Sequence, residues 1–332
     1  MGKTARHVDI LFLDQKDVRA VITPEEAFEA VEYAFRMHAY RKVQMPAKIY
    51  LDYYRFRGDL RAMPAYIVPA GASGVKIVNS HANNSRAGLP SVMAIFVLVE
   101  PETGRPISIM DATYFTDLRT GAAGAVAAAY LSRKDASVLG LVGAGRQAMA
   151  QLVAIARVRG IRLAKVCAKT NKEAVDFADR MRGMTDIPVE ACDMKDVCDA
   201  DIVSTTTPSR RPIVRDEWIL PGTHINAVGA DAPGKQELEP GILKRARVFL
   251  DDFGQATHSG EVNVGLSTSE IVPGDIQGEI GEVVTGKKKG RVSRKDITIF
   301  DSTGLAVQDV SIALKIYRNA LKVHRGKVLR LF

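Results

Sequence analysis

Three charged side chains stand among apolar or glycine neighbours, where a charge needs an explanation. Lys76 interrupts the apolar run 75–78, Arg119 begins an alanine-rich stretch, and Asp231 follows an apolar segment and precedes Pro-Gly. The pKa of a lysine falls readily on burial, which suits proton transfer, and an arginine binds a carboxylate or phosphate through paired hydrogen bonds. A lysine, an arginine and an aspartate in such positions together predict acid–base chemistry on an anionic substrate. An edge-facing lysine, a surface ion pair and a turn-forming aspartate remain the alternatives.

A glycine pattern, Gly143-x-Gly145-x-x-Ala148, stands between the apolar run 138–142 and the periodic run 149–158. Strand, glycine turn and helix in this order are the context of a dinucleotide-binding fingerprint. The first glycine permits a sharp turn, the second lets a pyrophosphate approach the backbone, and the small Ala148 lets the helix pack on the strand. Free N–H groups at the helix start bind phosphate well. The pattern therefore predicts a bound dinucleotide.

Downstream of this turn, short apolar runs alternate with helical patterns such as 171–184. This alternation indicates a doubly wound parallel sheet. Ligands bind such sheets at the carboxyl ends of the strands, so we expect residues 205–207 and 230–232 at the same rim as the glycine turn. The expected strands are 162–167, 188–192, 200–205, 224–229, 247–251 and 296–300.

The N-terminal third follows a different pattern, dominated by strands that suit antiparallel pairing. Thr23 and Glu26 form a capping box that predicts a helix start. Segments 48–53 and 60–67 predict a hairpin with its turn at residues 57–59. Further strands are expected at 74–79, 93–99 and 106–110, a helix at 118–130, and a last helix that returns to this unit.

The end of the second expected strand bears on the choice of cofactor. NAD enzymes usually carry an acidic residue there, which binds the ribose 2′-OH. This chain instead has Ala168-Lys169-Thr170, with no carboxylate. A cation and a hydroxyl suit the extra 2′-phosphate of NADP, so the sequence favours NADP over NAD. A surface lysine at the start of a loop is the alternative.

Composition excludes several other classes of protein. The chain has 332 residues, 46% of them hydrophobic, and no run near the ~20 apolar residues of a membrane span. The net charge of +8 is spread among acids, so we expect no nucleic-acid partner. Three cysteines without ligand spacing suggest reduced thiols in a cytoplasmic protein, and with His81 and His224 they predict no metal site. The charged N-terminus does not resemble a signal peptide.

Five segments together resemble the ornithine cyclodeaminase/μ-crystallin family. They follow one another along almost the whole chain, at 74–81, 117–123, 143–148, 229–235 and 300–304. Within the family, segments 58–65 and 205–209 most resemble the archaeal alanine dehydrogenase branch. The resemblance implies an α/β fold in which a Rossmann-type doubly wound parallel sheet is joined to an α+β domain for substrate binding and dimerisation. The expected boundaries are 1–117 with 305–332, and 118–304.

The resemblance also implies roles for single residues. Lys76 and Asp231 would be catalytic, and Lys48 and Arg119 would bind the substrate, although the family often has an arginine at the position of Lys48. The expected cofactor-binding residues are Arg119, Thr120, Gly143, Ala144, Gly145, Arg146, Gln147, Ala168, Lys169, Thr170, Thr206, Val228, Gly229, Ala230, Ser302 and Thr303.

The implied activity is NAD(P)-dependent oxidative deamination of a small L-amino acid by a homodimer. L-alanine would give pyruvate, a 2-oxo acid, and ammonia, and the reaction would be reversible. Three alternatives stay open: an ornithine cyclodeaminase, a ketimine or pyrroline-2-carboxylate reductase, and a non-catalytic NADPH-binding protein like μ-crystallin. Residues 60–62 lack the acidic group that a cyclodeaminase needs for the distal amine, which argues mildly against the first.

Overall fold

The computed structural model describes residues 8–330. Its contacts divide the chain into two compact units, which we call unit 1 (residues 1–119 and 305–332) and unit 2 (residues 120–304). Each unit has its own sheet. Helix α3 (Thr113–Leu131) contains residues of both units. It begins five residues before the predicted 118–130, and its additional first turn includes the buried Phe115. Among the described residues, no helix is both long enough and apolar enough to cross a membrane.

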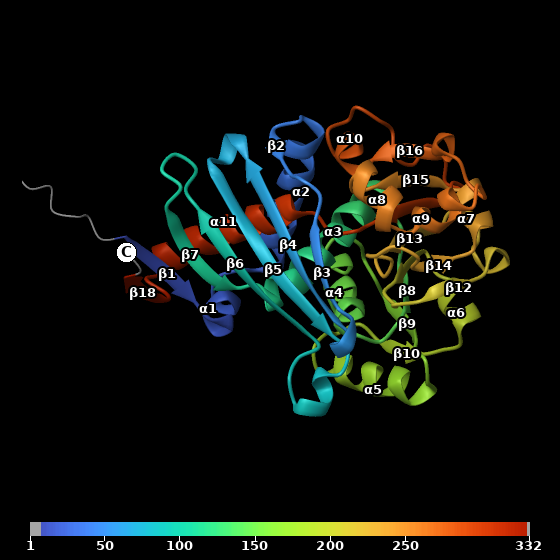
Figure 1. Ribbon diagram of the computed structural model, residues 1–332. Helices are drawn as coiled ribbons and strands as arrows, with labels where there is room; N and C mark the ends of the chain where they lie inside the picture. The colour runs from blue at the N-terminus through green and yellow to red at the C-terminus, as the bar shows by residue number, and fades with distance from the viewer. Residues whose placement is uncertain (1–7, 331–332) are drawn as a thin grey trace, which may run out of the picture. The chain divides into compact units, whose positions relative to one another are not determined.

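Unit 1 is built on a mostly antiparallel sheet in the order β18-β1-β7-β6-β5-β4-β2, with β3 paired to β4 (Figure 1). Among the strands that the structure describes in this sheet, only β1 and β7 pair in parallel. The strands are β1 (Asp9–Leu13), β2 (Val43–Gln44), β3 (Ile49–Tyr53), β4 (Gly58–Ile67), β5 (Ala72–His81), β6 (Val92–Val99), β7 (Pro106–Asp111) and β18 (Lys327–Arg330). The helices are α1 (Gln15–Ala20), α2 (Pro24–Ala39) and α11 (Ala306–Lys322).

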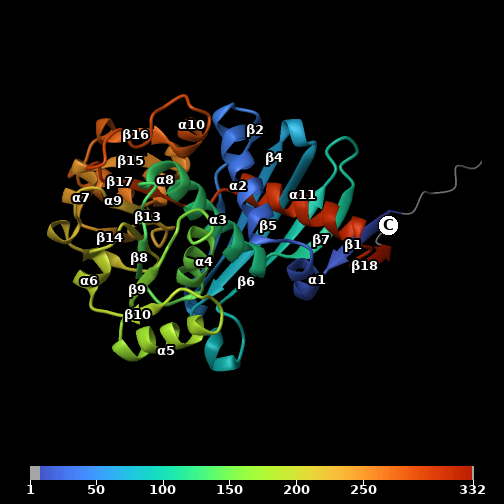
Figure 2. The ribbon, with the colours of Figure 1, turned by 180° about the vertical axis from the view of Figure 1, so that it is seen from behind.

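Two helices cover one face of this sheet, as the view from behind shows (Figure 2). Helix α2 starts as predicted, because Thr23 and Glu26 each accept a backbone hydrogen bond from the other at 3.2 Å. Helix α11 packs on α2 and on strands β4 and β5. Alternate residues of the strands, such as Phe96 and Leu98 of β6, are buried beneath the helices. The last helix of the chain therefore belongs to unit 1, and it packs against β5, the strand that contains Lys76.

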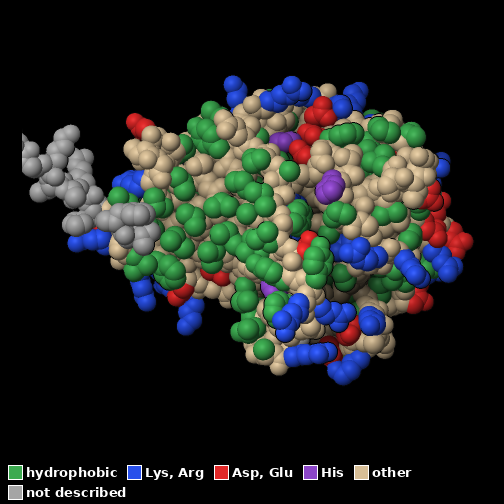
Figure 3. Space-filling view, viewed as in Figure 1, with side chains coloured by type: hydrophobic (Ala, Val, Ile, Leu, Met, Phe, Trp, Pro, Cys, Tyr) green, Lys and Arg blue, Asp and Glu red, His purple; other side chains and the backbone are tan. Residues whose placement is uncertain are grey.

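The opposite face of the sheet in unit 1 is apolar and exposed. Ile49 and Leu51 of β3 and Met93 and Ile95 of β6 are all more than a third exposed. The space-filling view shows hydrophobic side chains gathered over these strands (Figure 3). Apolar patches of this kind on a sheet face mark interaction surfaces.

The predicted hairpin exists, but its turn lies elsewhere. The chain reverses in a 3₁₀ turn at Tyr54–Phe56, followed by Arg57 at φ 51°. Gly58 is already in β4 and pairs with Tyr53. Its missing side chain serves close packing, because a Cβ there would lie 2.4 Å from the ring of His81. The prediction of a turn at 57–59 is therefore right for Arg57 and wrong for residues 58 and 59, which lie in β4.

Unit 2 contains a fully parallel sheet in the order β10-β9-β8-β11-β13-β17-β15-β16. Its strands are β8 (Val138–Val142), β9 (Leu163–Cys167), β10 (Val189–Ala191), β11 (Ile202–Thr205), β13 (His224–Ala227), β15 (Arg247–Leu250), β16 (Ile276–Glu279) and β17 (Thr298–Asp301). A small separate sheet pairs β12 (Arg210–Val214) with β14 (Gln236–Leu238). The helices are α4 (Arg146–Ile155), α5 (Asn171–Arg182), α6 (Met194–Cys198), α7 (Pro240–Arg245), α8 (Phe253–Ser259), α9 (Val262–Ser267) and α10 (Ile280–Val284).

The order of these strands confirms the predicted doubly wound sheet. The chain runs from β8 outward to β9 and β10, then returns to place β11 on the other side of β8. The gap between the carboxyl ends of β8 and β11 is the topological switch point, where such sheets bind ligands. Helix α4 begins at Arg146, three residues before the predicted 149. The prediction started too late because the first turn of the helix is polar and shows no apolar periodicity.

Candidate active site

In unit 1 the structure brings Lys76 and Arg119 together on a third residue, Asp309. The Lys76 Nζ lies 2.9 Å from Asp309 Oδ1 and 2.8 Å from Oδ2, and the two side chains are 1% and 0% exposed. The Arg119 Nε lies 3.3 Å from Asp309 Oδ1. Strand β5, helix α3 and helix α11 thus each place one charge in a buried cluster.

Asp309 and its neighbour Gln308 were missed by the sequence reasoning. Gln308 Oε1 accepts hydrogen bonds from Arg119 Nη1 at 3.2 Å and from the Leu305 N–H at 3.1 Å. Both residues are fully buried on α11. The available signal was two adjacent polar residues inside the otherwise apolar run 305–310. The same logic that singled out Lys76 would have found them.

Burial controls the protonation of Lys76. It lowers the pKa of Lys76 to about 7, with the nearby charges of Arg119 and Lys48 acting in the same direction and Asp309 opposing them. Lys48 is half-buried just before β3. A lysine that titrates near neutral pH can give and take protons during turnover. The cluster carries more positive than negative groups, so it favours an anion such as a substrate carboxylate.

In unit 2 the glycine turn has the geometry that a dinucleotide requires. Gly143 adopts φ 109° and donates its N–H to the Cys167 carbonyl at 2.9 Å. A Cβ on Gly143 would lie 2.6 Å from Thr206 Oγ1. Gly145 caps the start of α4, and a Cβ built on it meets no atom within 4 Å. The helix start is therefore open for a phosphate group.

A pocket of about 630 Å³ lies beside this turn, within unit 2. Six predicted cofactor-binding residues line it: Gly143, Ala144, Gly145, Ala168, Lys169 and Thr206. Glu173, which the sequence reasoning missed, lines it too. The size, the helix start and the apolar walls fit the adenosine and pyrophosphate parts of a dinucleotide.

The other predicted cofactor-binding residues do not line this pocket. Arg146 and Gln147 begin α4, and the Thr170 hydroxyl caps α5 by accepting the Glu173 N–H at 3.3 Å. Thr120 lies in α3, Val228 to Ala230 follow β13, and Ser302 and Thr303 follow β17. The Thr303 hydroxyl lies 3.0 Å from an oxygen of the buried Asp251 carboxylate.

Asp231 stands after β13 at the carboxyl rim of the unit 2 sheet, as predicted. Its carboxylate forms an ion pair with Lys235, four residues later, at 2.5 Å. Its side chain is 35% exposed. A carboxylate that is paired but open to solvent is available to accept a proton from a bound molecule.

Buried acids behind this rim hold its loops in place. Glu237 accepts hydrogen bonds from the Thr207 N–H at 2.6 Å and the Gly229 N–H at 3.0 Å, and so ties the end of β11 to the end of β13. Glu261 accepts the N–H groups of Glu237 and Leu238. Burial raises the pKa of both glutamates. None of these acids was predicted.

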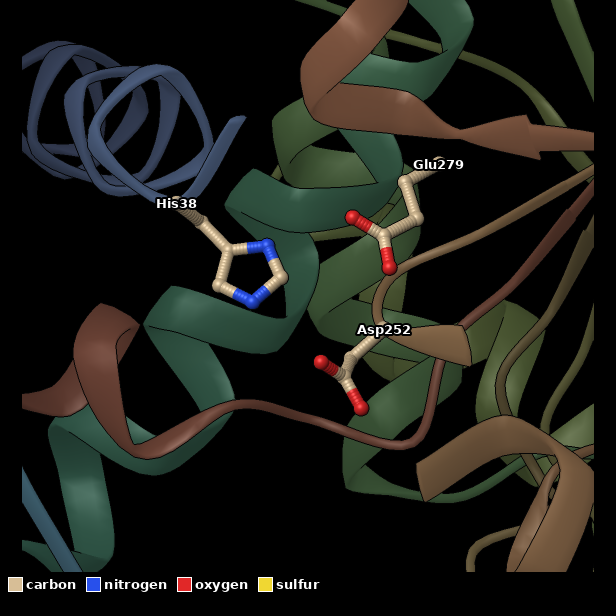
Figure 4. Close-up of side chains that lie close together, drawn as sticks. All are labelled: His38, Asp252 and Glu279. Atoms are coloured by element: carbon tan, nitrogen blue, oxygen red, sulfur yellow. The ribbon is translucent and has the colours of Figure 1, made fainter. Parts of the chain in front are cut away.

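Two further carboxylates of unit 2 have a structural explanation (Figure 4). Asp252 accepts the Gln255 N–H at 2.8 Å, and Glu279 accepts the Phe253 N–H at 3.0 Å. Both satisfy backbone donors in the first turn of α8 that would otherwise lack a partner. His38, also labelled in Figure 4, lies on α2.

Comparisons with known proteins agree with this architecture. Residues 8–324 match the model of the ornithine cyclodeaminase/mu-crystallin family. The chain belongs to this family. The family prediction and the predicted Rossmann-type fold class are thereby confirmed.

Within the family, the chain is similar to the alanine dehydrogenase of Archaeoglobus fulgidus, with 49% identity over 98% of this chain and 99% of that protein. A solved archaeal alanine dehydrogenase dimer with bound NAD superposes with a TM-score of 0.94, at 48% identity and covering 98% and 100% of the two chains. The Thermococcus litoralis Δ1-pyrroline-2-carboxylate reductase, solved with NADH and L-proline, has a TM-score of 0.93 at 34% identity, covering 96% and 99%. The predicted likeness to archaeal alanine dehydrogenases is confirmed.

Proposed function

We propose that this chain is an NAD(P)-dependent amino-acid dehydrogenase that interconverts L-alanine with pyruvate and ammonia. The observation that carries the proposal is the buried Lys76–Asp309–Arg119 cluster, which supplies an anion site and a titratable lysine in a family fold that also has a dinucleotide pocket. The similarity to an alanine dehydrogenase over the full chain supports the enzyme class and the substrate.

Each group has a defined task in this proposal. Arg119 and Lys48 bind the substrate carboxylate together with the Lys76 ammonium, and Lys76 also exchanges a proton with the substrate nitrogen. The bound nicotinamide supplies the acceptor for the hydride from Cα. Asp231 takes a proton from the water that attacks the resulting imino acid and returns it to the nitrogen of the carbinolamine. Ammonia then leaves as the carbinolamine hydroxyl loses its proton, which gives the 2-oxo acid. The reverse sequence forms the amino acid.

The alternative of an ornithine cyclodeaminase finds no support in the hairpin of β3 and β4. That reaction needs an acidic group free to bind a distal amine. The acid nearest to the predicted segment, Asp59, forms a 3.0 Å ion pair with Arg61 of the same strand. A distal amine would therefore have to compete with Arg61 for this carboxylate.

We favour NADP as the coenzyme. The pocket contains Lys169 at the end of β9, where NAD enzymes usually present a carboxylate. Glu173 lines the same pocket and would disfavour a 2′-phosphate, so the balance between these two charges sets the preference.

Replacing Lys169 by alanine is expected to weaken NADPH binding about 10-fold and to leave NADH binding within about 2-fold, because one charge-assisted contact to the 2′-phosphate is lost. Fluorescence titration of both coenzymes measures this. Lys172→Ala is the matched control, since Lys172 is 83% exposed on the next helix and pairs with Asp176. Equal loss of both coenzymes in Lys169→Ala would contradict the NADP preference.

We propose that the chain forms a homodimer through the exposed apolar face of the unit 1 sheet. Ile49 and Leu51 are 59% and 53% exposed there, and the solved archaeal alanine dehydrogenase is a dimer. Sedimentation equilibrium should give twice the 36.1 kDa chain mass. A monomer at micromolar concentration would count against this surface.

A coenzyme-coupled assay tests the function itself. NADPH and NADH oxidation is followed at equal concentrations with pyruvate plus ammonium, Δ1-pyrroline-2-carboxylate, and no oxo acid. We expect steady turnover with pyruvate and ammonium. Turnover of the cyclic imine alone would assign a reductase, proline formed from ornithine without net coenzyme change would assign a cyclodeaminase, and coenzyme binding without turnover would assign a binding protein.

A further inference from the structure

Helix α11 delivers to the lysine cluster a residue for which no role has been assigned. Asp309 lies in the first turn of α11, is fully buried, and contacts both Lys76 and Arg119. We propose that Asp309 is a positioning residue, which holds the Lys76 ammonium and the Arg119 guanidinium in fixed orientations toward the substrate carboxylate. This inference rests on the proposed function.

The geometry leaves each cation with donors for a substrate. The Lys76 ammonium donates one hydrogen bond to Asp309 Oδ1 at 2.9 Å, and Asp309 Oδ2 lies 2.8 Å from the same nitrogen, so the carboxylate fixes the position of the ammonium. An ammonium has three N–H groups, so others remain for a substrate. The Arg119 Nε lies 3.3 Å from Asp309 Oδ1, and the Arg119 Nη1 donates a hydrogen bond to Gln308 Oε1. One turn of α11 therefore orients both cations.

Stability alone does not explain this carboxylate. A buried ion pair gains little over well-packed apolar residues, because the charges lose their hydration. The surrounding turn of α11 buries Val307 and Val310, so apolar packing is available at this place in the fold. A carboxylate at this position is therefore explained by the two cations that it holds, which bind the substrate in the proposed function.

The positioning role has a consequence for pH dependence. The charged groups that act on Lys76 are Arg119 on α3 and Lys48 before β3, which lower its pKa, and Asp309 on α11, which raises it. Asp309 is the acid in this set, so its neutralisation moves the pKa of Lys76 from about 7 to a lower value. The Lys76 ammonium then loses its proton at a lower pH than in the unmodified protein, and substrate binding that requires the ammonium is lost at that lower pH.

The test compares Asp309→Asn with Asp309→Glu in the full-length protein. For Asp309→Asn we expect kcat/KM for pyruvate at pH 7.5 to fall about 100-fold or more. In the pH profile of kcat/KM, the loss of activity at high pH (the high-pH limb) should move to a lower pH by about one unit or more. NADPH affinity should stay within about 2-fold, because the coenzyme pocket is untouched. Asp309→Glu, which keeps the charge, should return the limb to within about half a unit of the unmodified enzyme.

Asp17→Asn is the control for a loss of stability without a change in the cluster. Asp17 belongs to unit 1, pairs with Arg325 and helps to cap α1. We expect it to lower the melting temperature and to leave the limb in place. A folded Asp309→Asn variant with an unmoved limb would overturn the positioning role.

A second measurement separates this inference from the proposed function. If the unmodified protein turns over no substrate, the proposed function fails, and coupling between Lys76 and Asp309 is still measurable in thermal unfolding. The double variant Lys76→Met/Asp309→Asn should lose less in melting temperature than the two single losses added together, because it leaves no unpaired lysine charge. Additive losses would show that Asp309 does not hold Lys76.

Discussion

Replacing Lys76 with methionine is expected to lower kcat/KM for pyruvate and ammonium by about 10³-fold. Methionine has nearly the length of lysine but cannot donate or accept a proton, so the acid–base step and one substrate contact are both lost. The Lys76 side chain is 1% exposed, and Asp309 keeps its ion pair with Arg119 in the variant. Initial rates of NADPH oxidation measure the effect, and NADPH titration should show unchanged coenzyme binding.

Lys315→Met is the matched control for this substitution. Lys315 lies in the same unit on α11, 36% exposed, and pairs with Glu26 and Glu29 away from the cluster. Its activity should stay within about 2-fold, since exposed ion pairs of this kind contribute little. If Lys76→Met kept a tenth or more of the activity while folded, the lysine would have no acid–base role.

Substitutions at the two glycines of the turn are expected to separate coenzyme binding from folding. Gly145→Ala should weaken NADPH binding about 100-fold with little change in melting temperature, because its Cβ occupies space that only the pyrophosphate needs. Gly143→Ala should weaken binding at least as much and also destabilise the fold by about 2 kcal/mol, since φ 109° is strained for alanine and its Cβ would lie 2.6 Å from Thr206 Oγ1.

Gly160→Ala completes this comparison. Gly160 lies in the loop before β9, outside the pocket, and a Cβ there meets no atom within 4 Å. Both the melting temperature and the NADPH affinity should stay unchanged. NADPH affinity that is equal in Gly145→Ala and Gly160→Ala would show that no phosphate approaches the turn.

The parallel sheet and the glycine turn were predictable because their signals are local. A strand, a glycine with a left-handed backbone and a helix start follow one another within residues 138–155. Short apolar runs separated by helical patterns indicate a doubly wound sheet without any long-range information. The same holds for the Thr23–Glu26 capping box, whose partners are three residues apart.

Local patterns were less informative where one residue type serves two purposes. Gly58 was predicted to lie in a turn, as many glycines do, but it lies in β4 because His81 from the neighbouring strand fills the space of a side chain. The first turn of α4 was missed because Arg146 and Gln147 do not continue the apolar periodicity of the run that follows them. A neighbour distant in sequence decided the first case, and a weak local pattern explains the second.

The family, the two kinds of sheet and the candidate chemistry of Lys76, Arg119 and Asp231 could all be predicted from the chain, because charges in apolar runs and glycine spacings are local features. The partners of those charges come from long-range packing. Asp309 follows Lys76 by 233 residues, and Glu237 binds the ends of two strands that are far apart in the chain. Such partners are selected by the packing of α11 on β5 and of β11 beside β13, and packing depends on which faces are brought together when the chain folds.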